Sequence, residues 1–564
     1  MTVDLVLRGG TICDGTGLPS RTGDVVVHEG RILGTGLFDG RARREIDVAG
    51  CIVAPGFVDV HTHYDAQVTW DRLCTPSPWH GVTTVVLGNC GFGLAPCPSS
   101  RRDSLLRMLE HVEGMPYASL CAGVVWEWET FPQYLEALRR RPLGPNVGVL
   151  LGHSPLRADV LGDAAYERTA TGDEIARMQD AVRQAMAAGA LGLATSRSPG
   201  HVGEGGRPVP SRRADRAELA SLVAAMAESG RGVLEITPET FPLSTDELAF
   251  LQELSRASRR PVSFSAILDL PDREGVWDGV LADLRRGRES GAQVHPQVSC
   301  RPMRFDFDLE TGCASLDVLP CWRRFRGAGS TAERLALLAE AEFRETFRRE
   351  ALGRPESPSA KRWASAVLEH ATRPEHASLV GRTLSEIARE RGGDEADALL
   401  DLSRAEELKA RFSMTLLNFD EERVGALLRE PEALIALSDA GAHVSILCDA
   451  GYATHLLGYW VRERGLFSWE EAVRRLSAMP ARIYGIPDRG RLVPGAVADV
   501  TCFDPERVAM RRPERVRDFP ADTERYVVRA DGIELVLVGG RELVVAGETT
   551  DERPGAVVAP AGSS

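Results

Sequence analysis

The sequence lacks several features that would place a protein in or outside a membrane. No apolar run approaches the ~18 residues of a membrane span. The first residues also lack the basic segment and longer apolar segment that mark a secretory signal. Eleven cysteines are scattered without paired spacing, so a disulfide framework is not expected. These absences together predict a cytoplasmic protein with reduced thiols and no membrane partner.

Positive charge is in deficit, and lysine is nearly absent. The net charge is −14, which disfavours nucleic acid as a partner. Lysine occurs only at Lys361 and Lys409, so nearly all of the 67 basic residues are arginine. What is present is ordinary for a globular protein: 564 residues, 43% hydrophobic and 26% charged. Such a chain can build a large core and more than one domain.

The two ends of the chain share one pattern. Residues 1–54 alternate short β-rich runs with Gly/Asp turns, and residues 488–550 show the same pattern. Because neither piece alone is long enough for a comfortable β-sandwich, we expect both to form one small β-sandwich domain. The last stretch, residues 551–564, is rich in small residues, Pro and Gly, which predicts an unstructured tail.

The segment between the ends, residues 55–487, alternates short apolar runs with helical patterns, as parallel strands with crossover helices do. Helices are expected at about 102–112, 173–188, 215–229, 245–257 and 276–290. Eight runs qualify as strands: "GFVDVHTH", "TTVVLGNCG", "NVGVLLGHS", "ALGLATSRS", "GVLEITPE", "PVSFSAIL", "QVHPQVS" and "ALIALSDAG". The pattern predicts an α/β fold with a TIM-like (β/α)8 barrel, whose catalytic residues lie at the carboxyl ends of the strands.

A long insert, at about residues 300–430, separates the seventh and eighth candidate strands and far exceeds an ordinary connection. It is rich in Arg and Glu and carries helical patterns of its own. Two interpretations remain open. The insert is a lid or subdomain over the barrel mouth, or it is an outward-facing interaction surface.

Two histidines, His61 and His63, stand one residue apart where the first strand should end. Side chains at i and i+2 of a strand point the same way, so both imidazoles should project from one face. Neutral imidazole suits zinc and related metals. Cys90 and Asp439 also end predicted strands, which favours a shared metal site over the alternative of two exposed loop histidines.

Longer motifs resemble a known family. "APGFVDVHTHYDAQ" and "LSDAGAH" resemble the amidohydrolase superfamily. "GNCGFGLAPC", "WEWETFPQYLEAL", "NVGVLLGHSPLR" and "GALGLATSRSPG" are similar to the N-acyl-D-amino-acid deacylases, or D-aminoacylases. The resemblance spans nearly the whole chain apart from the insert. It implies a hydrolase of carbon–nitrogen (non-peptide) bonds that acts on a small-molecule amide and uses one Zn²⁺, with a second zinc and a homo-oligomer left open.

The resemblance also assigns roles to the four strand-end residues. It implies that His61 and His63 are metal ligands from the first strand and that Cys90 is the ligand from the second. Asp439 matches the aspartate of the last strand, which binds metal or the attacking water and shuttles a proton. The chemistry is coherent, because a metal lowers the pKa of bound water towards ~7. A carboxylate then takes the proton and returns it to the leaving amine.

The sequence departs from the family pattern on two strands. Family members place a histidine at the end of the fifth strand and another at the end of the sixth, where this chain has Glu235 and Ala266. Glu235 could ligate the metal as a carboxylate or bridge two metals. A carbamylated lysine is not expected in that role, because neither Lys361 nor Lys409 lies on a predicted barrel strand.

The expected partners of a substrate carboxylate are also missing. Leu268 stands where the family has a lysine, and no arginine follows Asp439 in "LCDAGYATH". Arg197, Arg301 or Arg304 could replace them, since a planar guanidinium suits a carboxylate, or could make structural ion pairs instead. The candidate substrate-binding residues are therefore Arg197, His201, His295 and Arg301, and the substrate could be a larger or differently functionalised amide.

The remaining histidines and glycines have more ordinary interpretations. We expect His153 to bond to the barrel wall. His443 could orient a residue near the metal or cap a turn. The glycines of "GNCGFG" are expected to let the backbone turn around Cys90 rather than to bind phosphate. Two other functions stay open: a degenerate barrel that binds a ligand without turnover, and a hydrolase of a cyclic amide or imide.

Overall fold

The computed structural model describes residues 2–270, 273–310, 312, 316, 319–353 and 358–561. The chain divides into two compact units. Unit 1 comprises residues 1–267, 275–301 and 425–564, and unit 2 comprises residues 268–274 and 302–424. Among the described residues, none of the helices has the length and apolar character that a membrane crossing requires.

The centre of unit 1 is an eight-stranded sheet whose neighbouring strands are all parallel. Its strands are β6 (Phe57–Asp59), β7 (Val82–Leu87), β8 (Asn146–Gly152), β9 (Gly192–Ser196), β10 (Val233–Thr237), β11 (Val262–Ile267), β12 (Val294–Val298) and β16 (Leu434–Ile435). A parallel bridge between Thr62 and Ala440, which follow β6 and β16, closes the sheet. The predicted TIM-like barrel is confirmed, with all eight strands at the predicted places.

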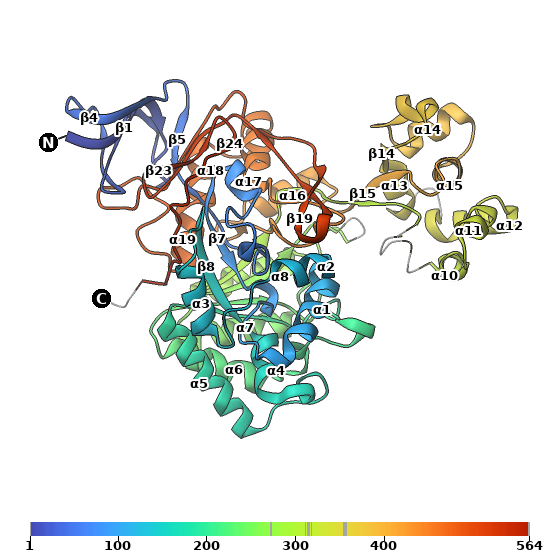
Figure 1. The fold of residues 1–564 in the computed structure, drawn as a ribbon, viewed down its shortest axis with the longest axis horizontal. Helices are drawn as coiled ribbons and strands as arrows, with labels where there is room; N and C mark the ends of the chain where they lie inside the picture. Colours follow the sequence, from blue (N-terminus) through green and yellow to red (C-terminus); the bar gives the residue numbers. More distant parts are fainter. Residues whose placement is uncertain are drawn as a thin grey trace. The chain divides into compact units, whose positions relative to one another are not determined.

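Helices connect the strands and cover the sheet, as Figure 1 shows. They are α1 (Arg102–Glu113), α2 (Tyr117–Gly123), α3 (Phe131–Arg139), α4 (His153–Leu161), α5 (Gly172–Ala188), α6 (Arg216–Ala227), α7 (Thr245–Ser258), α8 (Asp278–Glu289), α16 (Glu421–Leu428), α17 (Tyr452–His455), α18 (Trp469–Leu476) and α19 (Ala478–Ile483). The five helices predicted from periodicity are α1, α5, α6, α7 and α8. Capping explains where two of them start: Thr171 and Glu174 form a capping box at α5, and Ser244 caps α7.

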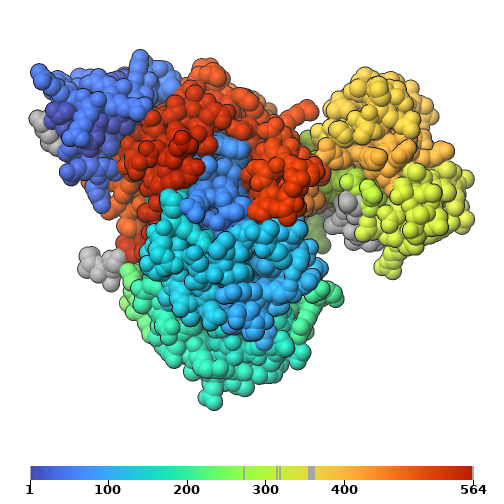
Figure 2. All heavy atoms as spheres, viewed as in Figure 1, coloured from blue at the N-terminus to red at the C-terminus, as the bar shows by residue number. Residues whose placement is uncertain are grey.

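Strands from both chain ends form one nine-stranded sheet, made of β1 (Thr2–Ile12), β2 (Arg21–His28), β3 (Arg31–Gly36), β4 (Arg41–Asp47), β5 (Ile52–Pro55), β17 (Val500–Phe503), β22 (Ile533–Val538), β23 (Arg541–Val545) and β24 (Glu548–Thr549). β5 pairs with β17, which joins the two ends. Leu7, Val53, Val500 and Leu537 share its core. The prediction that the two chain ends build one β structure is confirmed, as a single sheet within unit 1. Figure 2 shows the two segments, blue and red, side by side.

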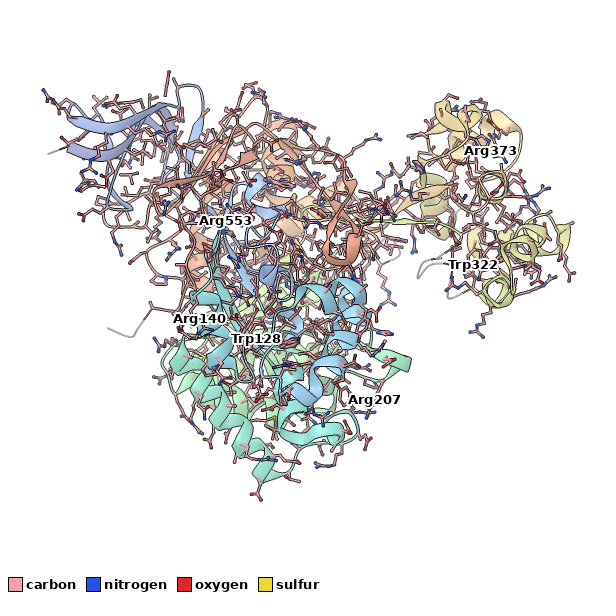
Figure 3. The ribbon with its side chains drawn as sticks, in the orientation of Figure 1. Trp128, Arg140, Arg207, Trp322, Arg373 and Arg553 are labelled. Carbon is pink, nitrogen blue, oxygen red and sulfur yellow. The ribbon has the colours of Figure 1, made fainter. Side chains whose placement is uncertain are left out.

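The C-terminal segment differs from the unstructured tail expected for residues 551–564. Backbone hydrogen bonds of 2.9 Å join Val147 of β8 to Ala556 and to Val558. Val558 is buried in the same apolar cluster as barrel residues such as Leu150. Arg553, labelled in Figure 3, marks the start of this segment. A stretch of small residues therefore packs against the barrel, and residues 562–564 lie outside the described residues.

Unit 2 contains most of the predicted insert. Its three-stranded sheet has the order β13 (Met303–Phe307), β15 (Arg411–Leu417), β14 (Val367–His370), and its helices are α10 (Pro320–Gly327), α11 (Thr331–Leu337), α12 (Ala341–Phe347), α13 (Pro358–Ser365), α14 (Leu384–Arg391) and α15 (Glu395–Ala405). Trp322, labelled in Figure 3, is fully buried and stacks on Phe325 with ring centroids 4.3 Å apart. The unit thus has an aromatic core of its own.

Candidate metal centre

The two histidines of the first strand lie beyond the end of β6. The predicted strand reached His63, whereas the structure ends β6 at Asp59. The backbone still follows the sheet, because the main-chain N–H of His63 donates to the carbonyl of Ala440 at 2.7 Å. The rings of His61 and His63 lie 5.3 Å apart between centroids, and both side chains are buried. The i, i+2 spacing therefore brings both imidazoles to one place, as predicted.

Cys90 lies on a tight turn after β7. The turn spans Asn89–Gly91, and Cys90 itself has left-handed backbone angles, with φ 55° and ψ 15°. Gly88 must be glycine here, because its φ is +86° and a Cβ would lie 2.3 Å from the carbonyl oxygen of Leu150. The turn directs Sγ of Cys90 to 3.5 Å from Nε2 of His61. The expectation that these glycines turn the backbone around Cys90 agrees with this geometry.

Asp439 reaches the same point from the last strand. Its backbone is also left-handed, with φ 42°. Oδ1 of Asp439 lies 3.3 Å from Nε2 of His61 and 3.7 Å from Nε2 of His63. The ligand atoms of His61, His63 and Cys90 all lie within 4.8 Å of one another. The ends of the first, second and last barrel strands thus direct nitrogen, sulfur and oxygen donors to one location.

Each imidazole faces a side-chain oxygen at its other ring nitrogen. Nδ1 of His61 lies 2.7 Å from Oε1 of Gln297, whose Nε2 donates to Ser263 at 3.0 Å. Nδ1 of His63 lies 3.2 Å from Oε1 of Glu113. With Nδ1 protonated, each ring offers the lone pair of Nε2 towards Asp439. Sequence analysis missed Glu113 entirely, since a glutamate before a helix-ending glycine carries no recognisable signal.

Glu235 lies beside the three donors rather than among them. Oε2 of Glu235 accepts the main-chain N–H of Cys90 at 2.8 Å. Oε1 accepts Ser265 Oγ at 3.3 Å and lies 4.0 Å from Nδ1 of His61. The fully buried carboxyl therefore supports the turn that presents Cys90.

The site concentrates buried acidic groups. Burial raises the pKa of Glu235 to about 8 and the pKa of the Cys90 thiol to about 12. Burial opposes ionisation of Asp439 as well, but the interaction with His63 and the neighbouring histidine charges hold its pKa below the usual range. Burial lowers the pKa of His61 to about 4, so its imidazole is neutral at pH 7. A divalent cation here would favour the ionised forms of the acidic groups.

Other candidate residues lie outside this cluster. Arg197 pairs with Glu239 at 2.7 Å, and Arg301 pairs with the buried Asp449 at 2.7 Å. His295 lies 3.4 Å from Glu432, which precedes β16, so this contact is at the amino end of the strands. The structure does not bring these three residues to the donors, and Arg304 belongs to unit 2, where it lies 3.3 Å from Glu369.

Three further histidines can be placed. His201 packs on Phe92 with ring centroids 5.3 Å apart, and its Nδ1 lies 2.6 Å from Ser196 Oγ. His153 bonds Thr195 and Glu218 within the barrel wall, at 2.8 and 2.9 Å. The N–H of His443 donates to the carbonyl of Glu113 at 2.5 Å. His201 is thus beside the Cys90 turn, and His443 is beside Glu113.

The donor set fits a zinc-type ion. Imidazole nitrogens, a cysteine thiolate and a carboxylate oxygen are the ligands that zinc takes, and four such groups suit tetrahedral coordination. The surroundings of His63 raise its pKa well above the usual value, so His63 and the Cys90 thiol would each release a proton when the ion binds. Both histidines already meet an outer group: His61 is hydrogen-bonded to Gln297, and His63 lies at ion-pair distance from Glu113. Fold and donors together define a class: a (β/α)8 barrel with a candidate metal site at the carboxyl ends of its strands.

Comparison with known proteins names that class. The model of the amidohydrolase family matches residues 44–544, and the chain belongs to this family. It is 32% identical to a D-aminoacylase of Alcaligenes xylosoxydans xylosoxydans, over 99% of this chain and 97% of the relative. It is similar to the structure of N-acyl-D-glutamate deacylase from Bordetella bronchiseptica in complex with zinc and a phosphonate inhibitor, with TM-score 0.67, 28% identity and coverage of 99% of this chain and 100% of the other.

A second solved structure bears on the metal. A D-aminoacylase, described as having a binuclear metal centre with one-metal activation and second-metal attenuation, matches with TM-score 0.66 and 28% identity, over 99% of this chain and 100% of the other. The chain is therefore an amidohydrolase-family protein related to D-aminoacylases, with the His61/His63 pair of a candidate metal site in place.

Proposed function

We propose that this protein is a zinc-dependent hydrolase that cleaves the carbon–nitrogen bond of a small-molecule amide. The observation that carries the proposal is the convergence of His61, His63, Cys90 and Asp439 from three strand ends. The relationship to D-aminoacylases supports an N-acyl-D-amino acid or a similar amide as the substrate. One zinc is proposed, because the three mutually close donors form a single group in the described part of the chain.

His61, His63 and Cys90 would hold the ion, with Asp439 as a fourth ligand or as the partner of the attacking water. When bound, zinc supplies Lewis acidity and lowers the pKa of water. The carboxylate of Asp439 accepts a proton from the attacking water and returns it to the leaving nitrogen. The carboxyl of Asp439 has a pKa below its usual range and is therefore ionised at neutral pH, the form that a proton acceptor must have.

The arginine contacts favour a second candidate substrate class, an amide without a free carboxylate, such as a cyclic amide or imide. Arg197 and Arg301, the residues expected to meet a substrate carboxylate, each already contact a carboxylate of the chain. If a substrate carboxylate took either arginine, Glu239 or Asp449 would lose that partner. Separating the buried carboxylate of Asp449 from its arginine is costly in free energy.

The test has two parts. Metal analysis of the purified protein should find stoichiometric zinc, or zinc should be taken up and restore turnover after chelation. A panel of N-acyl-D-amino acids, N-acyl-L-amino acids, the corresponding carboxamides and cyclic imides should then reveal one hydrolysed class. Protein that neither holds zinc nor gains activity with any divalent metal would refute hydrolysis and favour a ligand-binding barrel.

A further inference from the structure

The end of helix α1 holds a buried acidic side chain that the proposed reaction does not use. Glu113 is the last residue of α1 and is only 3% exposed. An acidic side chain in the last turn of a helix opposes the helix dipole, and burying a carboxyl without a partner costs free energy. The stability of helix α1 by itself therefore gives no reason for a glutamate at this position.

The contacts of Glu113 supply that reason. Its Oε1 lies 3.2 Å from Nδ1 of His63, an ion-pair contact, and has no hydrogen-bond partner in the described part of the chain. The opposite ring nitrogen of His63, Nε2, lies 3.7 Å from Oδ1 of Asp439. An acceptor at Nδ1 keeps the proton there and leaves the lone pair of Nε2 for a ligand.

The same helix end also reaches the loop that follows Asp439. The carbonyl of Glu113 accepts the N–H of His443, and Ser445 Oγ donates to the carbonyl of Gly114 at 3.2 Å. The N–H of Ala442 in turn donates to the carbonyl of Asp439 at 2.8 Å. The end of helix α1 thus contacts both segments that meet where the barrel closes: the one that carries His63 and the loop that follows Asp439.

We infer that Glu113 is a positioning residue for the metal: its carboxylate accepts the Nδ1 proton of His63 and fixes Nε2 as the ligand atom. Gln297 does the same for His61 through an amide oxygen. The two imidazoles therefore have different acceptors, one neutral and one anionic. The inference rests on the proposed zinc site.

The experiment compares two substitutions by metal affinity, measured with zinc and a competing chelator. Glu113→Met removes the acceptor at similar volume, whereas Glu113→Gln keeps an acceptor oxygen of the kind that Gln297 already offers. Loss of such an outer group lowers metal affinity about 10- to 100-fold. We expect that loss in Glu113→Met and recovery of most of the affinity in Glu113→Gln. Glu110→Met, a half-exposed position on the same helix, is the matched control and should bind as the unaltered protein does.

Two readouts separate positioning from a merely structural role. The absorption spectrum of the cobalt(II)-loaded protein should change in Glu113→Met and not in Glu110→Met, because it reports ligand geometry. In a His63→Ala background, Glu113→Met should cause no further loss of affinity, since its effect passes through His63. If Glu113→Met does not fold, nitrogen NMR of the unaltered zinc-loaded protein should find His63 protonated at Nδ1 and metal-bound at Nε2.

The outcomes are distinct. Zinc binding by Glu113→Met with unaltered affinity, equal weakening of the Met and Gln variants, or a metal on Nδ1 of His63 would overturn this inference and leave the proposed function intact. Absence of zinc binding by the unaltered protein would overturn the proposed function itself, and the inference with it.

Discussion

Nε2 of His61 lies 3.3 Å from Oδ1 of Asp439, although one residue follows the first strand of the barrel and the other follows the last. Only closure of the barrel brings them together, and the Thr62–Ala440 bridge is the backbone contact that does so. The candidate metal centre is therefore a consequence of the fold: the side chains meet only in the closed barrel. Five predictions test this account.

Replacing Cys90 by alanine should weaken zinc binding strongly, because one of three mutually close donors is lost. Equilibrium dialysis with zinc measures the effect. Cys97→Ala is the matched control: Cys97 is buried a few residues away but belongs to no donor group in the described part of the chain. Equal zinc affinity of the two variants would show that Cys90 is not a ligand.

Replacing Asp439 by asparagine should reduce kcat about 10²- to 10⁴-fold, the usual contribution of a proton-transfer group. The amide keeps the size of the side chain but cannot accept the proton. Steady-state kinetics with a substrate found in the amide panel measure it. Asp488→Asn makes the same chemical change at an exposed carboxyl and should leave kcat unchanged. An unchanged kcat in Asp439→Asn would show that Asp439 is not the proton shuttle.

Glu235→Gln separates a ligand role from support of the Cys90 turn. If Glu235 ligates metal, the variant should lose zinc and turnover while the thermal stability of the zinc-free protein stays nearly unchanged. If it mainly accepts the Cys90 N–H, that stability should fall as well, since a buried acceptor is altered. Thermal melting of the zinc-free and zinc-loaded proteins distinguishes the two results.

Zinc affinity should rise with pH. Burial holds the pKa of the Cys90 thiol at about 12, so the thiol is protonated at neutral pH and must release its proton to bind zinc. Each released proton makes the affinity about tenfold higher per pH unit. Calorimetry in buffers of different ionisation enthalpy counts the protons, and Cys90→Ala should release one fewer. Affinity that falls with rising pH would contradict protonated donors.

Gly114→Ala should destabilise the protein by about 1–2 kcal/mol, the cost of a left-handed backbone for an L-residue. Gly114 has φ +60°, and an added Cβ would lie 3.3 Å from Cα of His443. Denaturant unfolding measures the change. Gly172→Ala is the control, because Gly172 begins helix α5 with nothing within 4 Å and should be neutral or slightly stabilised. An equal change in the free energy of unfolding of the two variants would refute the close approach of α1 to the His443 loop.

The sequence allowed prediction of the barrel because its signals are local. Apolar runs and helical periodicity identify each strand and five of the helices, and the i, i+2 spacing places His61 beside His63. Glycines on either side of Cys90 indicate the turn that presents it. These features depend on neighbours along the chain, so no tertiary knowledge is needed.

The features that were missed or placed differently depend on contacts between distant segments. Glu113 meets His63 because a helix end reaches the first strand. His295 shares a strand face with Gln297, but its depth in the barrel gives it Glu432 as a neighbour. The composition of residues 551–564 suggests disorder, yet Val557 bridges to Val147. Periodicity gives the direction of a side chain, whereas depth and partners come from packing.

The most direct test of the account is anomalous scattering recorded on either side of the zinc absorption edge from zinc-soaked crystals. The account predicts one strong peak bonded to Nε2 of His61, Nε2 of His63 and Sγ of Cys90, with Asp439 facing it. No peak at these atoms, or a peak bonded to Nδ1 of either histidine, would contradict it.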